Sequence, residues 1–167
     1  MRDVDQAVRA RMNGAGSLTE ALGREMIALD ATHTRRLLEI FKVHGFPGIE
    51  LVGKDGVQAV LILVLHSPSI ELQKQSLSYL TKAWRRREVP PEAVAGMTDT
   101  LRHRQGKPQI YGTRFEIVDG KLVLGKIKDP ARLHQRRAKL GLMPMSEYVK
   151  GLEEMYKLPV EPTSIPR

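Results

Sequence analysis

The 167-residue sequence contains no cysteine, which excludes disulfide bonds, thiol catalysis and cysteine-ligated metal sites. Aromatic residues are also scarce, at 5%, so a hydrophobic core has to be built mainly from aliphatic side chains and methionine. A chain without cysteine is compatible with a reducing compartment.

Long apolar runs are absent as well. The longest, at residues 57–65, is about half the length needed to cross a bilayer. Residues 1–5 lack the apolar stretch of a secretory signal. We therefore expect a soluble, cytoplasmic protein with no membrane association.

Basic residues are plentiful and give the chain a net charge of +8. They cluster at residues 82–87, 102–107 and 132–139. A solvated basic surface is the ordinary explanation, and an anionic partner such as nucleic acid or a phosphorylated ligand is the alternative. Nucleic acid is not favoured, because the clusters lack the interleaved aromatic residues on which single strands stack.

Helical periodicity dominates the apolar pattern and predicts a mainly α fold of about seven helices in one domain over residues 1–157. A proline-rich, extended tail is expected over residues 158–167. Helices are predicted after a cap at Ser17, over residues 29–44 and over residues 68–86 with Ser67 as the N-cap. Residues 57–66 fit either a buried strand or a buried helix, and the helix is preferred because it places Gln58, Ile62 and His66 on one face. Further caps are predicted at Asp129 and Ser146. The predicted stripe of the 68–86 helix is Ile70, Gln73, Leu77, Leu80 and Trp84.

In one segment the apolar residues alternate with a period of two residues, as in a β-strand. Alternating β-formers flank Asp119-Gly120, which is typical of a two-residue hairpin with a type I′ turn. We expect this hairpin over about residues 109–127, packed over the helix junction that carries His66.

Three polar residues occupy positions where an apolar side chain is expected. His66 ends the apolar run, His33 lies inside the stripe of the 29–44 helix, and Gln73 replaces a leucine. Burying such groups costs about 1–3 kcal/mol unless they are hydrogen-bonded. The structural explanation is that each forms a hydrogen bond to a backbone carbonyl or to another of the three. The functional explanation is that His66 and His33 transfer protons.

Other residues are candidates to complete such a site. Tyr111 precedes a glycine, and its hydroxyl is a candidate acid or substrate contact, although packing on the sheet would also explain it. Asp30 lies three residues before His33, where it is placed to orient the ring, and it is also a candidate to bind the substrate. Gln73 can bind an amide or carboxylate. Arg136 and Arg137 can clamp an anion, although a solvated helix face is the better explanation for at least one of them, because adjacent helix residues point about 100° apart.

A metal site is not favoured. His33 and His66 could be joined by Asp5 or Asp30, but the sequence has no His-x-x-x-His or His-x-x-Glu-His spacing. A serine nucleophile is also not favoured, because there is no Gly-x-Ser-x-Gly motif. We expect no cofactor.

Several short motifs are spread over nearly the whole chain. The most specific is Gly106-Lys107-Pro108-Gln109-Ile110-Tyr111-Gly112-Thr113; the others include residues 5–9, 45–48, 51–53, 63–66 and 136–137. Through these motifs the chain resembles a small, cytosolic, bacterial domain family of unknown function. The sequence departs from that pattern at Phe46, Leu65, Ser67-Pro68 and Arg114. The resemblance implies a fold and candidate positions, among them Gln109 as a substrate-binding residue, but no reaction.

These observations predict a small cofactor-independent enzyme, with histidine acid/base chemistry on a small polar metabolite or peptide side chain. A hydrolase, lyase, cyclase or isomerase acting in a biosynthetic tailoring step would fit. The alternative is a non-enzymatic binding module with a basic face for an acidic protein or nucleic acid.

Overall fold

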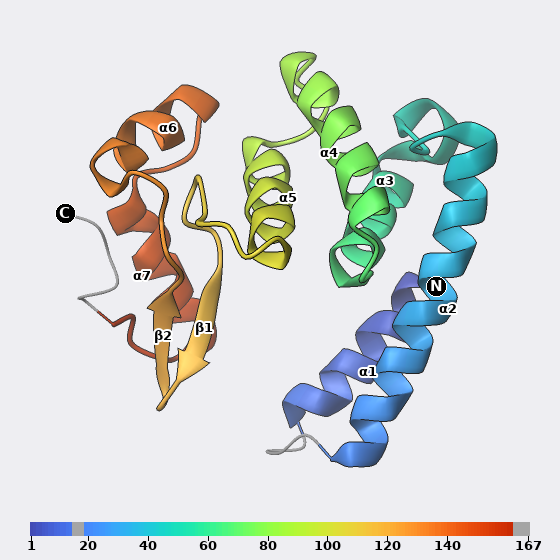
Figure 1. Ribbon diagram of the computed structural model, residues 1–167, viewed down its shortest axis with the longest axis horizontal. Coiled ribbons are helices and arrows are strands. Elements are labelled where there is room, and N and C mark those ends of the chain that lie inside the picture. Colours follow the sequence, from blue (N-terminus) through green and yellow to red (C-terminus); the bar gives the residue numbers. More distant parts are fainter. Residues whose placement is uncertain (15–18, 162–167) are drawn as a thin grey trace. The chain divides into compact units, whose positions relative to one another are not determined.

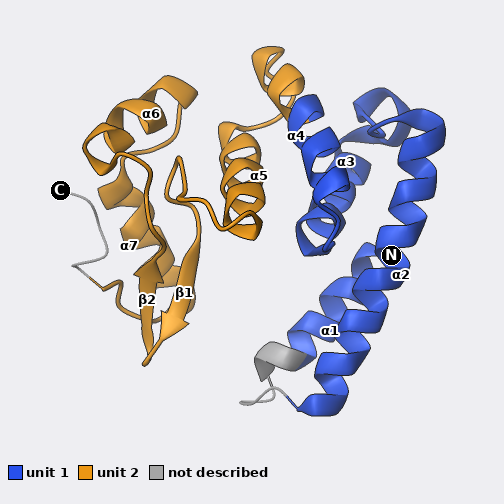
Figure 2. Ribbon diagram, viewed as in Figure 1, with its two compact units in different colours: residues 1–79 blue, residues 80–167 orange. Residues whose placement is uncertain are grey.

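The structure, a computed structural model, describes residues 1–14 and 19–161. The predicted cap at Ser17 lies outside these residues. The chain divides into two compact units, Met1–Tyr79 and Leu80–Arg167 (Figure 2), and each is described by itself. The prediction of one domain over residues 1–157 stays a prediction.

The fold class is confirmed. The described residues form a mainly α structure with seven α-helices, one short 3-10 helix and one two-stranded hairpin (Figure 1). Among these helices, none combines the length and apolar character needed to span a bilayer.

The first unit contains α1 (Arg2–Gly14), α2 (Glu20–His44), α3 (Ile49–His66) and the beginning of α4 (Ile70–Arg85). α1 contacts both α2 and α3, and α2 contacts α3 (Figure 1). Thr19 caps α2 by accepting a hydrogen bond from the Leu22 amide. The predicted end of the 29–44 helix at His44 is confirmed, and Gly45 follows it with a φ of 67° that suits glycine.

The apolar run at residues 57–66 is helical, as predicted, and forms the second part of α3. Gly53 interrupts this helix with a φ of 68° and a ψ of 176°. Ser67 ends α3 by donating its amide to the Leu63 carbonyl. Its predicted role as N-cap of the next helix is wrong, because the hydroxyl of Ser69 accepts the Leu72 amide and α4 begins at Ile70.

The buried face of α4 includes Gln73 and Leu80 of the predicted stripe, but it is shifted toward Leu72, Ser76 and Ala83. Leu72, Ser76, Leu80 and Ala83 are fully buried, whereas Ile70 is 39% exposed at the first helical position. Gln73 is buried as predicted. Ser76 and Ala83 also belong to the buried face. A pattern of large apolar residues does not predict this, because both side chains are small.

The second unit continues with α5 (Pro91–Arg104), β1 (Phe115–Val118), β2 (Lys121–Leu124), a 3-10 helix (Pro130–Arg132), α6 (Leu133–Leu140) and α7 (Met145–Tyr156). The predicted hairpin and its turn are confirmed, but its strands are shorter than the predicted 109–127: β1 and β2 are antiparallel, and Asp119 and Gly120 both have the positive φ that a type I′ turn needs. Its packing over the junction that carries His66 stays a prediction. Buried residues from the hairpin, from α6 and α7 and from the segment after α7 form one hydrophobic cluster of this unit: Leu122, Leu124, Leu133, Met145, Val149 and Val160.

Two predicted caps of this unit are wrong. Asp129 has a left-handed backbone and no side-chain cap, and a 3-10 turn follows it. α7 begins at Met145, one residue before the predicted cap Ser146. The start of the predicted tail is packed: the Leu122 amide donates to Pro159, the Leu122 carbonyl accepts the Glu161 amide, and Val160 is buried. Residues 162–167 of that tail lie outside the described residues.

Candidate functional site

His66, at the end of α3, faces a carboxylate from α1. Its Nδ1 lies 2.9 Å from Oδ2 and 3.0 Å from Oδ1 of Asp5. The Asp5 side chain is 1% exposed, whereas the His66 side chain is 26% exposed. An ionised carboxylate only accepts hydrogen bonds, so Nδ1 carries the proton and Nε2 keeps its lone pair.

Asp5 is itself held by two neighbours on α1. The side-chain amide of Gln6 donates to Oδ2 at 2.8 Å, and Nε of Arg9 donates to Oδ1 at 3.1 Å. Burial raises the pKa of Asp5, but the Gln6 hydrogen bond and the charges of His66 and Arg9 outweigh it and hold that pKa below its usual value. Asp5 is therefore a fixed anion in a protected position.

Arg9 connects the Asp5–His66 pair to α2. Its Nη2 donates to Oδ1 of Asp30 at 2.6 Å, and its Nη1 lies 3.3 Å from Sδ of Met26. Asp30 was predicted to orient His33, but in the structure the Asp30 carboxylate forms an ion pair with Arg9. The i, i+3 spacing is satisfied, yet a guanidinium from another helix competes better for the carboxylate than a buried neutral ring does.

His33 lies in the buried stripe of α2, 7% exposed, and its Nδ1 has no hydrogen-bond partner among the described residues. Burial lowers its pKa, and the charges of Asp5 and Asp30 only partly oppose this. The structure thus brings His33 into the electrostatic surroundings of Asp5, Arg9 and Asp30 without hydrogen-bonding it to any of them.

The pKa of His66 is lowered too. Burial is the main cause and Arg9 adds to it, while the charge of Asp5 and its hydrogen bond raise the pKa. Near neutral pH the ring is therefore an uncharged base, oriented through Nδ1. We call Asp5, Arg9, Asp30, His33 and His66 the α1–α3 cluster.

Gln73 and Ser67 hold the junction between α3 and α4. The fully buried amide of Gln73 donates to the carbonyls of Ser67 and Val64, at 3.1 and 3.4 Å. The Ser67 hydroxyl accepts hydrogen bonds from Thr34 and from the Ser69 amide. The contacts of Gln73 support its structural explanation. The hydroxyl of Ser67, the residue next to His66, is already hydrogen-bonded to Thr34 and Ser69.

The other predicted site residues belong to the second unit. Gln109 is 3% exposed, and its side chain donates to the carbonyls of Arg114 and Gly125 and accepts the Arg114 amide. The nitrogen and the oxygen of this amide are both engaged by the backbone, so the contacts support a structural role for Gln109.

Arg136 and Arg137 also bind backbone carbonyls. Arg136 donates to Ile110, Asp129 and Lys128. Arg137, 2% exposed, donates to Tyr111 and Met143 and lies over the ring of Tyr148, 4.9 Å from its centre. Burial lowers the pKa of Arg137. Both guanidinium groups stabilise loops in this structure.

Tyr111 is half-buried, and burial raises the pKa of its hydroxyl. Its backbone is fixed by Asp99, a fully buried carboxylate on α5. Asp99 accepts the amides of Ile110, Tyr111 and Thr113 and the hydroxyl of Thr113, at 2.7 to 3.2 Å. The motif at residues 106–113 is thus a loop wrapped around one carboxylate.

Sequence reasoning did not assign a role in acid/base chemistry to Asp5 or Arg9, and it did not identify Asp99. A signal existed for Asp5, because it shares helical spacing with Val8 on the apolar face of α1, and Val8 is buried. Over the part of the chain that the structure describes, no three His, Cys, Asp or Glu side chains are grouped so as to hold a metal ion.

Comparison with known proteins identifies one family. A model described as "Family of unknown function (DUF6624)" matches residues 1–161. No curated protein and no solved structure is significantly similar to the chain.

Proposed function

We propose, for a chain that belongs to the family of unknown function DUF6624, that His66 is a general base acting on a small polar substrate. The observation that carries this proposal is the contact of both Asp5 oxygens with Nδ1 of His66, at 2.9 and 3.0 Å. A carboxylate at Nδ1 fixes the ring and its tautomer, and it stabilises the imidazolium that forms when Nε2 takes a proton.

The electrostatics of the pair suit this role. A base has to be unprotonated at the working pH, and burial lowers the pKa of His66. The opposing effect of Asp5 keeps the ring basic enough to accept a proton. Partial exposure of the His66 side chain, 26%, leaves the ring accessible while its carboxylate partner is buried.

The proton that His66 removes has to come from the substrate or from water. Ser67 is the adjacent hydroxyl, but it is buried and bonded to Thr34 and Ser69. No hydroxyl among the described residues is hydrogen-bonded to His66, so the pair lacks the third member of a serine triad. Hydrolysis by an activated water, and isomerisation or elimination by removal of a substrate proton, both fit.

The test compares the wild type with His66→Gln, Asp5→Asn and His44→Gln. His44 is exposed at the end of α2, so it is the matched control. Each purified protein is incubated with a small-molecule extract, and mass spectrometry identifies what is consumed. We expect the wild type and His44→Gln to consume the same compound, His66→Gln to lose at least about a hundredfold in rate, and Asp5→Asn to be intermediate.

Folding is measured separately by circular dichroism and urea unfolding. If folded His66→Gln turned the compound over at the wild-type rate, the proposal would be wrong. If no compound were consumed by the wild type in extracts covering the main classes of polar metabolite, the binding-module alternative would be favoured.

A further inference from the structure

The second unit contains a cavity of about 430 Å³ that the proposed function does not use. It is bordered by residues 106–109, 114–116 and 125–126 and by His103. Its size is within the range of about 300–1,000 Å³ that small-molecule sites occupy.

Three cations from three different segments border this cavity: Lys107, Arg114 and Lys126. None of their side chains forms an ion pair or hydrogen bond with any described residue. Elsewhere many basic side chains have acidic partners, as in the pairs Arg11–Glu25 and Lys121–Glu161. Arg114 and Lys126 lie outside the basic runs of the sequence, so folding is what brings these cations to one place.

Hydrogen bonds from buried and loop-spanning side chains hold the backbone that borders the cavity in place. Gln109 ties the backbone at Arg114 to that at Gly125 through its buried side chain. Gly125 leaves no room for a side chain, since a Cβ there would lie 2.8 Å from Nε2 of Gln109. Arg102 donates to the Pro108 carbonyl at 2.6 Å and so holds the loop that carries Lys107.

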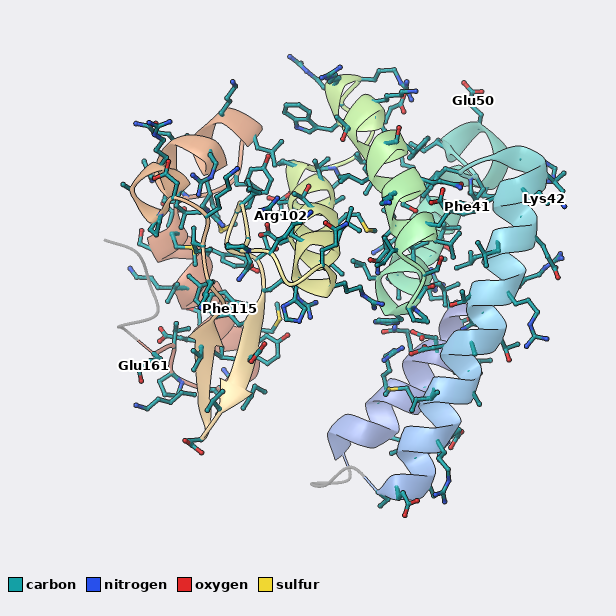
Figure 3. The ribbon with its side chains drawn as sticks, viewed as in Figure 1. Phe41, Lys42, Glu50, Arg102, Phe115 and Glu161 are labelled. Atoms are coloured by element: carbon teal, nitrogen blue, oxygen red, sulfur yellow. The ribbon has the colours of Figure 1, made fainter. Side chains whose placement is uncertain are left out.

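We propose that this cavity binds a small phosphate monoester. Among the described residues, Glu116 is the one carboxylate that borders the cavity, so Glu116 and the three cations together carry a charge of +2. A phosphate monoester carries a charge of about −1.5 to −2 at pH 7, and its oxygens accept charge-assisted hydrogen bonds from Lys and Arg. His103 adds a ring nitrogen, and Phe115, at the start of β1 (Figure 3), adds an aromatic wall for the organic part.

The test uses phenyl phosphate as the probe and phenyl sulfate, of similar shape but with one charge, as the comparison. Binding to the full chain is followed at pH 7.5 by calorimetry and by amide chemical shifts. We expect saturable binding of phenyl phosphate, shifts centred on residues 106–116 and 125–126, and binding of phenyl sulfate weaker by about tenfold.

Lys107→Gln and Arg114→Gln each remove one exposed cation and should weaken phenyl phosphate binding by about tenfold. Lys150→Gln, an exposed site on α7 that does not border the cavity, is the matched control and should change the affinity by less than about twofold.

The proposal is overturned if phenyl phosphate does not saturate, if the shifts centre elsewhere, or if Lys150→Gln weakens binding as much as the cavity variants do. A single-stranded RNA oligonucleotide is tested in parallel. If it binds more tightly than phenyl phosphate and loses affinity in the same variants, the surface is a nucleic-acid site and the proposal is likewise overturned.

Discussion

At the scale of single residues, Asp5 is the group on which the α1–α3 cluster depends. It is 1% exposed, and it accepts hydrogen bonds from Gln6, Arg9 and His66. Removing the buried Asp5 carboxylate should change the pKa of His66, because the two groups are in contact. Removing a side chain of α1 that does not contact His66 should leave this pKa unchanged.

We therefore predict that Asp5→Asn lowers the pKa of His66 below its wild-type value. Burial and Arg9 already lower this pKa, and the Asp5 carboxylate is the group that opposes them, so its neutral replacement leaves the lowering effects less opposed. The measurement is an NMR titration of the His66 ring. Asp3→Asn, 87% exposed on the same helix, is the control and should leave the titration unchanged. An unchanged His66 pKa in Asp5→Asn would contradict the coupling.

The sequence indicated His66, His33 and Gln73 because each polar side chain sits in an apolar pattern. It did not indicate the partner of His66, since Asp5 is 61 positions away and the contact exists only when α1 packs beside α3. Local spacing suggested instead that Asp30 would orient His33, and a contact between helices replaced it. Long-range pairing of this kind depends on helix packing, which periodicity does not encode.

At the scale of elements, the loop at residues 109–113 is organised by Asp99 of α5. Three backbone amides and one hydroxyl donate to this carboxylate. The amides of this loop have no neighbouring strand to pair with, and the buried Asp99 carboxylate accepts their hydrogen bonds instead. This carboxylate therefore holds a segment without regular secondary structure in one conformation.

We predict that Asp99→Asn lowers the free energy of unfolding by about 3 kcal/mol, because an amide group cannot accept from all these donors and leaves some of them unpaired. Thr113→Val, which removes only the hydroxyl bond, should cost about 1 kcal/mol. Urea unfolding measures both. Equal losses in the two variants would show that the backbone amides do not depend on Asp99.

A second prediction at this scale concerns the interruption in α3. Gly53 has a φ of 68° and a ψ of 176°, a backbone conformation essentially restricted to glycine, so Gly53→Ala should lower the free energy of unfolding by about 1–3 kcal/mol. Gly23, inside α2, gives the matched comparison, because a Cβ at this position would have no neighbouring atom within 4 Å. Gly23→Ala should raise the free energy of unfolding by about 0.5–1 kcal/mol. If both alanines stabilised the protein, the kink would not be a requirement of the fold.

The elements themselves were largely predictable. Apolar periodicity located the helices, and Asp119-Gly120 between alternating β-formers located the hairpin and its turn. The helix starts were less predictable: serine or aspartate was expected as the cap at positions 67, 129 and 146, and each expectation was wrong. Ser69, and not Ser67, caps α4. The 3-10 helix and α7 begin without a side-chain cap.

At the scale of the whole molecule, stability should depend on pH through His33 and His66 of the first unit. His33 and His66 both have a pKa below the usual 6.5, chiefly because burial disfavours the charged ring. In the unfolded chain these rings bind protons more readily. Below about pH 6.5 the unfolded state therefore binds more protons than the folded state, and acid favours unfolding.

We predict that the free energy of unfolding falls between pH 7.5 and pH 5.5, measured by urea denaturation of the full chain. Asp5 contributes outside this window, since its folded pKa lies below the usual 3.8 and its stabilisation is lost only at lower pH. His33→Leu removes one of the two rings and should reduce the fall, whereas His44→Gln, at an exposed position, should leave it unchanged. An equal fall in His33→Leu and the wild type would mean that the buried Nδ1 of His33 is not what resists protonation. The acid sensitivity would then have to come from His66 alone, so His66→Gln decides between the two rings within the same experiment.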